Sequence, residues 1–510
     1  MSTWKNDAVI VIGAGVGGLT AAVDLARRGA KVTVLETAPY PGGKMRQVTV
    51  AGAGIDAGPT VFTMRWIFER LFSDAGADLS DYLDLKPAEL LARHAWTSGG
   101  QLDLFADIDR SSDAIAAFAG AADAQGYRDF CRRSAAMYQT LAGTFIGAER
   151  PSVFDLTMRV GLGRVDQLIT ISPMKVLWSA LAEHFADPRL RQLFGRYATY
   201  VGSSPLLAPA TMMLVAHVEQ DGVWLVNGGM VKVAQALHQL GERHGAVYRF
   251  STPVAAITTS GGRADGVVLQ SGERLEADAI VFNGDASALA SKLLGADISR
   301  ATAVVSREER SLSAVTWCVS APTSGFELAH HNVFFADNYP DEFDAVFRRR
   351  DIVQSPTVYI CAQDRGAHDL PAPGARERML LLINAPPDGD KREFLASEYL
   401  ARTLSMLKRC GLSIDRTNAD SIATTPTEFD ALFPGTGGAL YGRANHGAFA
   451  SFKRPGSASD VRGLYLAGGS VHPGPGIPMA AMSGRLAAAR LLDDLAVSRG
   501  GKRTSQSFAP

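Results

Sequence analysis

The hydrophobic pattern at the start of the chain predicts a strand, a tight turn, a helix and a second strand. Residues 9–12 are all apolar and β-branched, as in the buried strands of a parallel sheet. Residues 20–28 carry leucine and alanine at helical spacing, and Gly29 ends the pattern. A second apolar run over 31–35 ends at the acidic Glu36. This order of elements is typical of a unit that binds a dinucleotide.

The turn between the first strand and the helix has glycines at the spacing that suits a pyrophosphate. Such glycines allow a tight turn, a close approach of backbone to ligand, and close packing of helix on strand. The helix N-terminus then offers free N–H groups and positive charge to phosphates. An acid after the second strand can bind both ribose hydroxyls, which disfavours NADP. A purely structural turn is the alternative. The residues expected at the ligand are Gly13, Ala14, Gly15, Val16, Gly17, Gly18 and Glu36.

Two glycine-containing segments follow Glu36 and extend the predicted site. In residues 42–46 a glycine pair precedes Lys44 and Arg46, either of which could reach a second phosphate, unless this is a solvated turn. Residues 54–61 predict a short strand that ends in a constrained turn. An extended flavin dinucleotide needs such repeated backbone contacts. The residues expected at the ligand are Gly43, Lys44, Met45, Gly58, Pro59, Thr60 and Val61.

The C-terminal part again reads as strand, turn and helix. A strand near 463–467 leads into a turn rich in glycine and proline, and the helix continues to about residue 492. Because this turn also exposes N–H groups at a helix start, both ends of the chain are predicted to hold one ligand. His472 could contact the flavin end or assist proton loss, or it could be a turn histidine held by backbone hydrogen bonds. The residues expected at the ligand are Gly468, Gly469, Ser470, Gly476, Ile477 and Met479.

The pattern predicts an α/β protein whose Rossmann-type dinucleotide-binding domain is discontinuous. Two further ligand contacts are expected from it: Val254, in a strand that passes the adenine, and Asn283, the last residue of the buried strand predicted over 279–283. Helical patterns over 168–185 and 190–200 and an apolar run over 205–218 predict either a core or the lining of an apolar tunnel that opens at a bilayer.

The predicted segments are 1–75, 221–300 and 456–498 for the dinucleotide-binding domain, 76–220 for a helical insertion that faces the substrate and could face a membrane, 301–455 for a mixed-sheet substrate domain, and 499–510 for a disordered tail.

Composition narrows the class of protein. A chain of 510 residues exceeds one hydrophobic core, and a net charge of −1 implies no general affinity for nucleic acid. The four cysteines lie far apart, so no metal site is predicted and a reducing compartment is favoured. No apolar run reaches the ~18 residues of a spanning helix, which leaves peripheral membrane contact. We therefore expect a position on the cytoplasmic side of the membrane.

Several of these motifs resemble the carotenoid desaturase family of FAD flavoproteins, within the phytoene desaturase and amine oxidase-like group. The resemblance rests on the N-terminal unit, on residues 41–44 and on the His-Pro-Gly-Pro-Gly-Ile-Pro run at 472–478. Further markers are residues 222–230, 329–335 and 433–443. The C-terminal run departs from the usual phytoene desaturase pattern and is similar to that of the 1-hydroxycarotenoid 3,4-desaturases (methoxyneurosporene dehydrogenases) of purple bacteria.

The resemblance implies FAD, a hydrophobic carotenoid substrate and dehydrogenation at C3–C4 of an acyclic 1-hydroxy or 1-methoxy carotenoid. Phytoene desaturase, another carotenoid desaturase or isomerase, an amine oxidase-like enzyme and a non-catalytic flavin-bearing carotenoid carrier are the alternatives. Because the cofactor carries the hydride transfer, no catalytic triad is expected. Arg443 or His446 could bind a substrate hydroxyl, and only one of the adjacent His330 and His331 could point into a cavity. The oligomeric state stays open.

Overall fold

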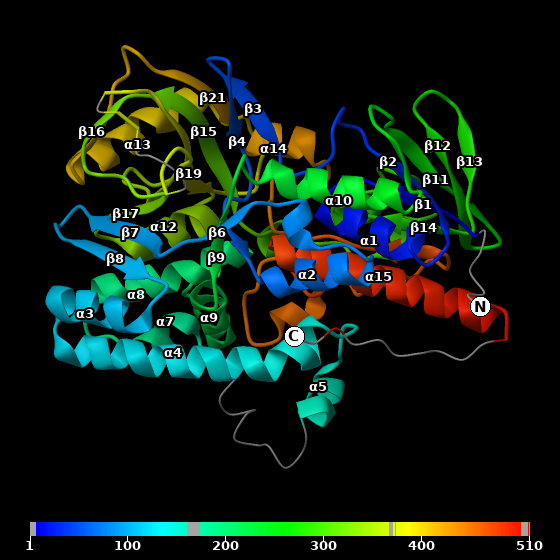
Figure 1. Cartoon of the computed structure of the whole chain (residues 1–510), viewed down its shortest axis with the longest axis horizontal. Helices are drawn as coiled ribbons and strands as arrows, with labels where there is room; N and C mark the ends of the chain where they lie inside the picture. Colours follow the sequence, from blue (N-terminus) through cyan, green and yellow to red (C-terminus); the bar gives the residue numbers. More distant parts are fainter. Residues whose placement is uncertain (1–6, 161–173, 367–370, 373, 501–507, 509–510) are drawn as a thin grey trace.

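The computed structural model describes residues 7–160, 174–366, 371–372, 374–500 and 508. Figure 1 shows two bodies side by side, one built around a parallel sheet and the other around a mixed sheet with helices beneath it. The chain crosses between the bodies several times, so each body combines segments that are distant in sequence. The confirmed outline is an α/β fold with a parallel sheet and a separate mixed sheet.

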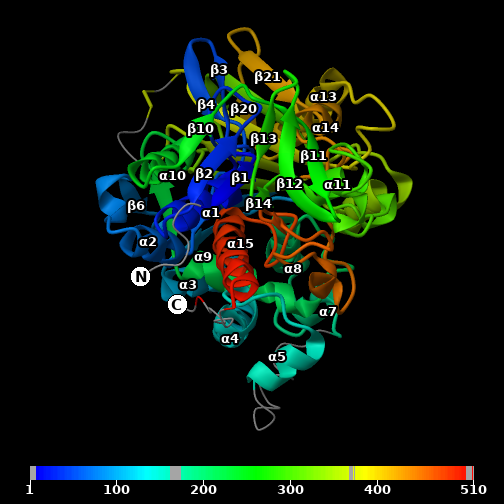
Figure 2. The same ribbon diagram turned by 90° about the vertical axis from the view of Figure 1, so that its right-hand side faces the viewer.

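Five strands form the parallel sheet in the order β10-β2-β1-β14-β22. Val11 of β1 pairs with Val34 on one side and Val281 on the other, and these positions are apolar because both faces of the sheet are covered. Helices α1, α10 and α15 cover one face, and a three-stranded antiparallel sheet covers the other (Figure 2). The elements are β1 (Ala8–Ile12), α1 (Val16–Ala26), β2 (Lys31–Leu35), α10 (Val231–Arg243), β10 (Val247–Arg249), β11 (Val254–Ser260), β12 (Arg263–Leu269), β13 (Arg274–Glu276), β14 (Ala279–Phe282), β22 (Leu464–Leu466) and α15 (Ile477–Ser498).

Helices α1 and α15 bring the two ends of the chain into direct contact. A Cβ on Gly484 of α15 would lie 2.2 Å from the Gly17 carbonyl oxygen, so only glycine permits this approach. Next to it, the fully buried Arg485 pairs with Asp24 of α1 at 3.0 Å. Close backbone packing and a buried ion pair therefore fix the C-terminal turn against the N-terminal one.

The mixed sheet has seven strands in the order β21-β15-β19-β18-β17-β7-β8. Four predicted strands are confirmed as β15 (Ser313–Ala321), β17 (His331–Phe335), β18 (Val358–Ala362) and β19 (Glu377–Ala385). The last two strands in this order, β7 (Leu90–Trp96) and β8 (Gln101–Phe105), come from the segment that was expected to be helical, and β7 pairs with β17 in parallel. The expectation for 76–220 was incomplete because β7 depends on pairing with β17, more than two hundred residues away, and β8 in turn pairs with β7.

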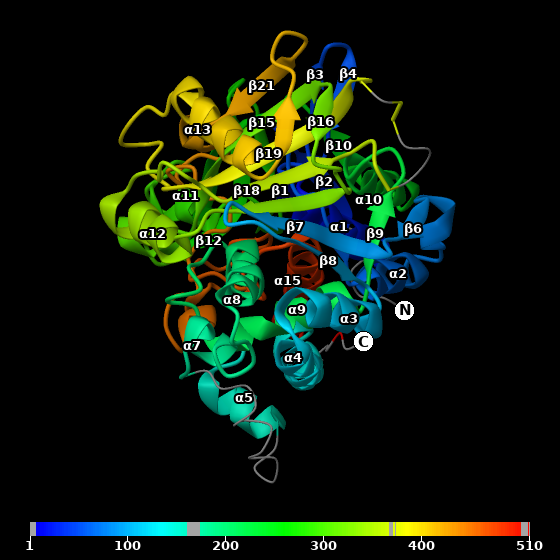
Figure 3. The same ribbon diagram turned by 90° about the vertical axis from the view of Figure 1, so that its left-hand side faces the viewer.

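Most helices of the 76–220 segment lie under the mixed sheet, and α5 stands apart from them (Figures 1 and 3). Residues 168–173 of the predicted helix over 168–185 lie outside the described residues. In the remaining part, 174–185, the structure has the short helix α7 (Leu177–Leu181). Within the described ranges, every helix is too short or too polar to cross a bilayer. The helices are α3 (Ile108–Ala119), α4 (Ala121–Leu141), α5 (Val153–Val160), α7 (Leu177–Leu181), α8 (Pro188–Gly195) and α9 (Leu214–Gln220).

Smaller elements connect these layers. The strands are β3 (Gln47–Val50), β4 (Ala53–Asp56), β5 (Phe62–Thr63), β6 (Leu85–Pro87), β9 (Val223–Val226), β16 (Thr323–Gly325), β20 (Leu412–Ile414) and β21 (Asp420–Thr424). The helices are α2 (Arg65–Asp74), α11 (Ala286–Ala290), α12 (Tyr339–Asp344), α13 (Ala396–Arg409) and α14 (Pro426–Leu432).

The expected disordered tail is wrong at one position. Phe508 is buried, its ring lies under the Arg485 guanidinium, and its N–H donates to the Gly147 carbonyl. The burial of Phe508 could not be predicted from the sequence, because a single aromatic residue in a polar tail has no hydrophobic periodicity. Residues 501–507 and 509–510 of that tail lie outside the described residues.

Candidate cofactor and substrate site

A cavity of about 1120 Å³ runs between the parallel sheet and the mixed sheet. It begins at the carboxyl ends of β1, β2 and β14, where Ile12, Leu35 and Phe282 contribute to its wall. This is the edge at which open α/β sheets bind ligands. Of the twenty-two predicted cofactor residues, all but Ala14 and Gly18 line the cavity.

The N-terminal turn forms the first cradle. Gly13 has φ +98°, and α1 starts after Gly15 with no side-chain cap and no acidic residue in its first turn. A Cβ on Gly18 would lie 2.1 Å from the Gly13 carbonyl oxygen, so Gly18 shapes the turn from behind. Asn283 also supports the turn, because its Nδ2 donates to the Gly13 carbonyl at 3.3 Å. The helix N-terminus therefore faces the cavity with its N–H groups available to an anion.

Glu36 closes this cradle at the end of β2. Its carboxylate accepts hydrogen bonds from the Ala14 N–H at 2.7 Å and the Ala38 N–H at 2.8 Å. These bonds fix the carboxylate in the cavity wall, where its remaining lone pairs suit ribose hydroxyls. Val254, at the start of β11, lines the same end of the cavity, as the adenine prediction requires.

The C-terminal turn forms the second cradle. Helix α15 starts after Gly476, which has φ +111° and provides no side-chain cap. The turn is anchored from behind, since the Gly468 N–H donates to Ser483 Oγ at 3.2 Å and Ser470 Oγ accepts from the Ala286 N–H at 3.0 Å. Two uncapped helix N-termini thus open on one cavity. Together with Glu36, they fit a dinucleotide cofactor.

Lys44 and Arg46 contact the mixed-sheet body. Lys44 Nζ donates to the Leu440 carbonyl at 2.6 Å, and Arg46 donates to Thr424 Oγ1 at 2.9 Å. Burial lowers the pKa of both groups. In the described structure these bonds hold the two bodies together, and neither side chain is engaged with the phosphate cradle, although both line the cavity.

Residues 58–61 mark where the cofactor half of the cavity meets its apolar half. A Cβ on Gly58 would lie 1.8 Å from the Lys44 carbonyl oxygen, which explains the glycine there. Thr60 Oγ1 lies 2.7 Å from Tyr359 Oη of β18 in the mixed sheet. Beyond this point the walls are largely aliphatic and aromatic, with contributions from Leu141, Phe145, Ile146, Leu156, Met212, Leu214, Val215, Val218, Phe429, Phe433, Phe449 and Phe452.

His472 is a turn histidine held by backbone hydrogen bonds, which was one of the two roles expected from the sequence. Its Nε2 donates to the Phe145 carbonyl at 2.9 Å and the Ala148 carbonyl at 3.0 Å. Burial lowers the pKa of His472 to about 4, so the ring is neutral near pH 7. The neighbouring Pro473 is among the described residues that line the cavity, and His472 is not.

The other candidate side chains also have protein partners. Arg443 forms an ion pair with Glu309, and His446 Nε2 accepts from the Ser204 N–H at 3.0 Å. The expectation that one of these two binds a substrate hydroxyl is therefore not supported by their placement.

His330, His331 and Cys361 form a cluster that the sequence did not reveal. Their ligand-capable atoms lie within 4.8 Å of one another, and the Cys361 thiol is 3.5 Å from His330 Nε2. His331 Nδ1 lies 2.8 Å from Tyr359 Oη. No spacing of cysteines along the chain indicates this set, because the pairing of β17 with β18 brings the histidines and Cys361 together.

Sequence reasoning also missed a polar group inside the apolar half. Arg196 and Tyr200 follow α8, Glu219 lies on α9, and all three line the cavity. The signal was charge next to apolar helical patterns: Arg191 and Arg196 lie within residues 190–200, and Glu219 directly follows the apolar run over 205–218.

Comparisons with known proteins show the family of this chain. The family model of the flavin-containing amine oxidoreductases matches residues 16–492. A hydroxyneurosporene desaturase of Rubrivivax gelatinosus is 52% identical, with 96% of this chain and 94% of that protein covered. A hydroxyneurosporene desaturase of Cereibacter sphaeroides is 42% identical, with 96% and 98% covered.

Among solved structures, putrescine oxidase bound to putrescine has a TM-score of 0.59 at 16% identity, with 96% of this chain and 99% of that chain covered. Cyclohexylamine oxidase from Brevibacterium oxydans has a TM-score of 0.56, also at 16% identity, with 96% and 99% covered. At this identity the likeness concerns the fold alone. The chain belongs to the flavin-containing amine oxidoreductase family, with FAD as its cofactor.

Proposed function

We propose that the protein is an FAD-dependent carotenoid desaturase that dehydrogenates the C3–C4 bond of an acyclic 1-hydroxy or 1-methoxy carotenoid. The observation that carries this proposal is the continuous cavity, which joins the dinucleotide cradle to a long slot with apolar walls. The relatives named hydroxyneurosporene desaturases support the same substrate class. Apolar walls suit a polyene, because binding removes a large apolar surface from water.

The residues of this chain contribute positioning and the exclusion of water. When bound, FAD supplies the acceptor for the hydride that leaves the substrate. The two helix N-termini would hold the cofactor at the end of the cavity next to the parallel sheet, and the aromatic and aliphatic walls would hold the polyene. A dry slot also protects a reacting carbon centre from water. The loss of a proton next to a polyene needs only a weak base, which is consistent with the structural role of His472.

An amine oxidase-like reaction is the enzymatic alternative outside the carotenoid class. Its support is the fold, which this chain shares with putrescine oxidase at 16% identity. The largely apolar substrate half of the cavity favours the carotenoid over a small polar amine.

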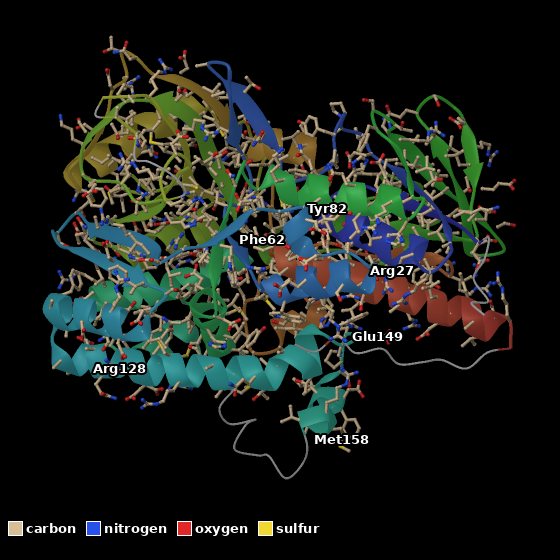
Figure 4. The ribbon with its side chains drawn as sticks, in the orientation of Figure 1. Arg27, Phe62, Tyr82, Arg128, Glu149 and Met158 are labelled. Atoms are coloured by element: carbon tan, nitrogen blue, oxygen red, sulfur yellow. The ribbon has the colours of Figure 1, made fainter. Side chains whose placement is uncertain are left out.

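We also propose peripheral membrane contact through α5, on the cytoplasmic side. Three of its apolar side chains are exposed, with fractions of 45% for Val153, 71% for Phe154 and 50% for Met158. Figure 4 shows Met158 at the far edge of the molecule. The inner side of the same helix lines the cavity through Leu156 and Thr157. A helix that is apolar on both sides, at one end of the slot, would let a carotenoid pass from lipid to protein without crossing water.

Product analysis tests the reaction directly. The purified protein is incubated with membranes that contain neurosporene, 1-hydroxyneurosporene or phytoene, and the pigments are separated by chromatography. The proposal predicts that 1-hydroxyneurosporene is consumed and gains one double bond at C3–C4. Consumption of phytoene alone would contradict the assignment.

A further inference from the structure

The apolar half of the cavity contains a group of polar side chains, here called the polar cluster. It consists of Arg196 and Tyr200 on the turn after α8, Glu219 on α9, Tyr339 on α12 and Tyr359 on β18. All five line the cavity. Charged and hydroxyl groups in such walls are costly unless they pair with one another or with a ligand.

Part of the polar cluster forms an internal network. Arg196 Nη1 donates to Tyr200 Oη at 2.9 Å, and Tyr200 in turn bonds to Glu219. The Glu219 carboxylate also accepts from Tyr197 Oη at 2.7 Å. Burial opposes the charge on Arg196, but Tyr200 and Glu219 raise its pKa overall. The guanidinium is therefore held as a fixed cation within the cavity.

Other hydrogen-bonding groups of the polar cluster have no partner in the described structure. Tyr339 is 2% exposed and lines the cavity, yet its Oη has no hydrogen-bond partner. A guanidinium carries several N–H donors, so the bond from Arg196 to Tyr200 leaves others for a ligand. Arg196 and Tyr339 line the same cavity, and the Arg196 guanidinium lies 5.2 Å from the centre of the Tyr359 ring. A buried hydroxyl without a partner, in one cavity with a cation that has spare donors, indicates an oxygen-bearing ligand.

The polar cluster also lies at the correct depth in the cavity. Its member Tyr359 contacts Thr60 at 2.7 Å, and Thr60 belongs to the segment where the cofactor half ends. In a 1-hydroxy carotenoid the oxygen is on C1, and the bond proposed to react is C3–C4. Substrate oxygen and reacting carbons must therefore bind next to each other, at the junction that Thr60 and Tyr359 mark.

We infer that Arg196 and Tyr339 bind the C1 oxygen of the substrate and so determine its specificity, with Tyr200 and Glu219 positioning Arg196. This inference rests on the proposed function. Both groups donate hydrogen bonds, so they serve an ether oxygen as well as a hydroxyl, and 1-methoxy and 1-hydroxy carotenoids both fit. A hydrocarbon end leaves the cation and the phenol unpaired, and that cost discriminates against it.

The test compares Arg196→Met and Tyr339→Phe with the matched control Arg348→Met, whose side chain is 84% exposed. We measure kcat/KM of the FAD-loaded proteins for 1-hydroxyneurosporene, its 1-methoxy analogue and neurosporene. Arg196→Met is expected to lose roughly 100-fold on both oxygenated substrates, and Tyr339→Phe roughly tenfold, because each leaves polar partners unsatisfied. On neurosporene, which has no oxygen for these groups to bind, the loss should be much smaller. The ratio of kcat/KM on 1-hydroxyneurosporene to that on neurosporene therefore falls in both variants, while the control keeps the wild-type ratio.

The outcomes separate the two proposals. If the wild-type protein turns over no 1-hydroxy carotenoid, the proposed function fails. If the wild type does so and both variants keep its selectivity ratio, the inference about Arg196 and Tyr339 is overturned. Should Arg196→Met fail to fold because the buried Glu219 loses the nearby positive charge, Tyr339→Phe, which removes one oxygen atom, decides the question alone.

Discussion

At the scale of single residues, His472 shows how a neutral buried ring can hold two distant segments together. It donates to the carbonyls of Phe145 and Ala148, more than three hundred positions earlier in the chain. The bonds tie the C-terminal turn to the segment that follows α4, where Phe145 and Ile146 line the cavity. The role of His472 is to hold the cavity wall in place. Protonation of its ring should therefore lower the stability of the fold and not act on the reaction itself.

The pH dependence of stability tests this role. The folded pKa of His472 is about 4, below its ordinary value of 6.5. Between these values the unfolded chain binds a proton that the folded chain does not, so stability falls as the pH drops from 6.5 towards 4. The contribution is about 3 kcal/mol. In His472→Gln the amide can still donate to a carbonyl but does not titrate, so the free energy of unfolding should fall less steeply over this range.

His94 and His446 are also buried with lowered pKa values. Because the substitution does not touch them, their contributions cancel when the two proteins are compared. Denaturant melts at several pH values measure the difference. We expect the variant to keep activity within a few-fold. A loss of more than about 100-fold with normal FAD content, equivalent to nearly 3 kcal/mol, would make His472 part of the chemistry.

The residues that could be predicted from the sequence are those whose role is local. Gly13 and Gly15 were predictable because turn geometry depends on neighbours in the chain. The role of His472 and the membership of Arg196 in a polar cluster were not, since their partners come from other segments.

At the scale of elements, the contact between α1 and α15 is what allows two turns from opposite ends of the chain to form one site. Gly484 permits the approach, and the pair of Arg485 with Asp24 is fully buried beside it. The helices and strands of the parallel sheet were predictable from their periodicity. Strands β7 and β8 were not, because this hairpin joins the mixed sheet through β17, which is remote in the sequence.

Separating α1 from α15 should release the cofactor. In Gly484→Ala the new methyl would lie 2.2 Å from the Gly17 carbonyl oxygen, so α15 must move away. Overpacking of this kind costs about 1–3 kcal/mol, and we expect at least a tenfold weaker Kd for FAD. Gly456→Ala is the matched control, since its Cβ would meet nothing closer than 3.4 Å. Unchanged FAD affinity in Gly484→Ala, measured by fluorescence titration, would show that the helix contact does not set the cradle.

At the scale of the whole molecule, one continuous cavity runs between the two bodies, and α5 contributes to its wall. The inner side of α5 lines the slot and its outer side exposes Phe154 and Met158. Such a position was not predictable in detail. The sequence indicated an apolar tunnel region, but only the assembled structure relates it to the cofactor.

Removing the exposed apolar groups of α5 should weaken membrane binding. We expect Phe154→Ser/Met158→Ser to bind vesicles of phosphatidylethanolamine and phosphatidylglycerol at least tenfold more weakly, since burial of each side chain contributes about 1.5–3 kcal/mol. Activity on substrate in detergent should remain, because neither residue lines the cavity. Val304→Ser, which changes a residue that is 71% exposed on another surface, is the control. Equal vesicle flotation of all three proteins would argue against α5 as the contact.

The most direct test of the central claim is an anaerobic titration of the FAD-loaded protein with 1-hydroxyneurosporene, followed by visible absorbance of the flavin. If one cavity places the cofactor beside the carotenoid, the flavin band bleaches in proportion to added substrate, and an equal amount of 3,4-desaturated product appears. If the pigment binds and the flavin stays oxidised, the protein is a carrier and the account is contradicted.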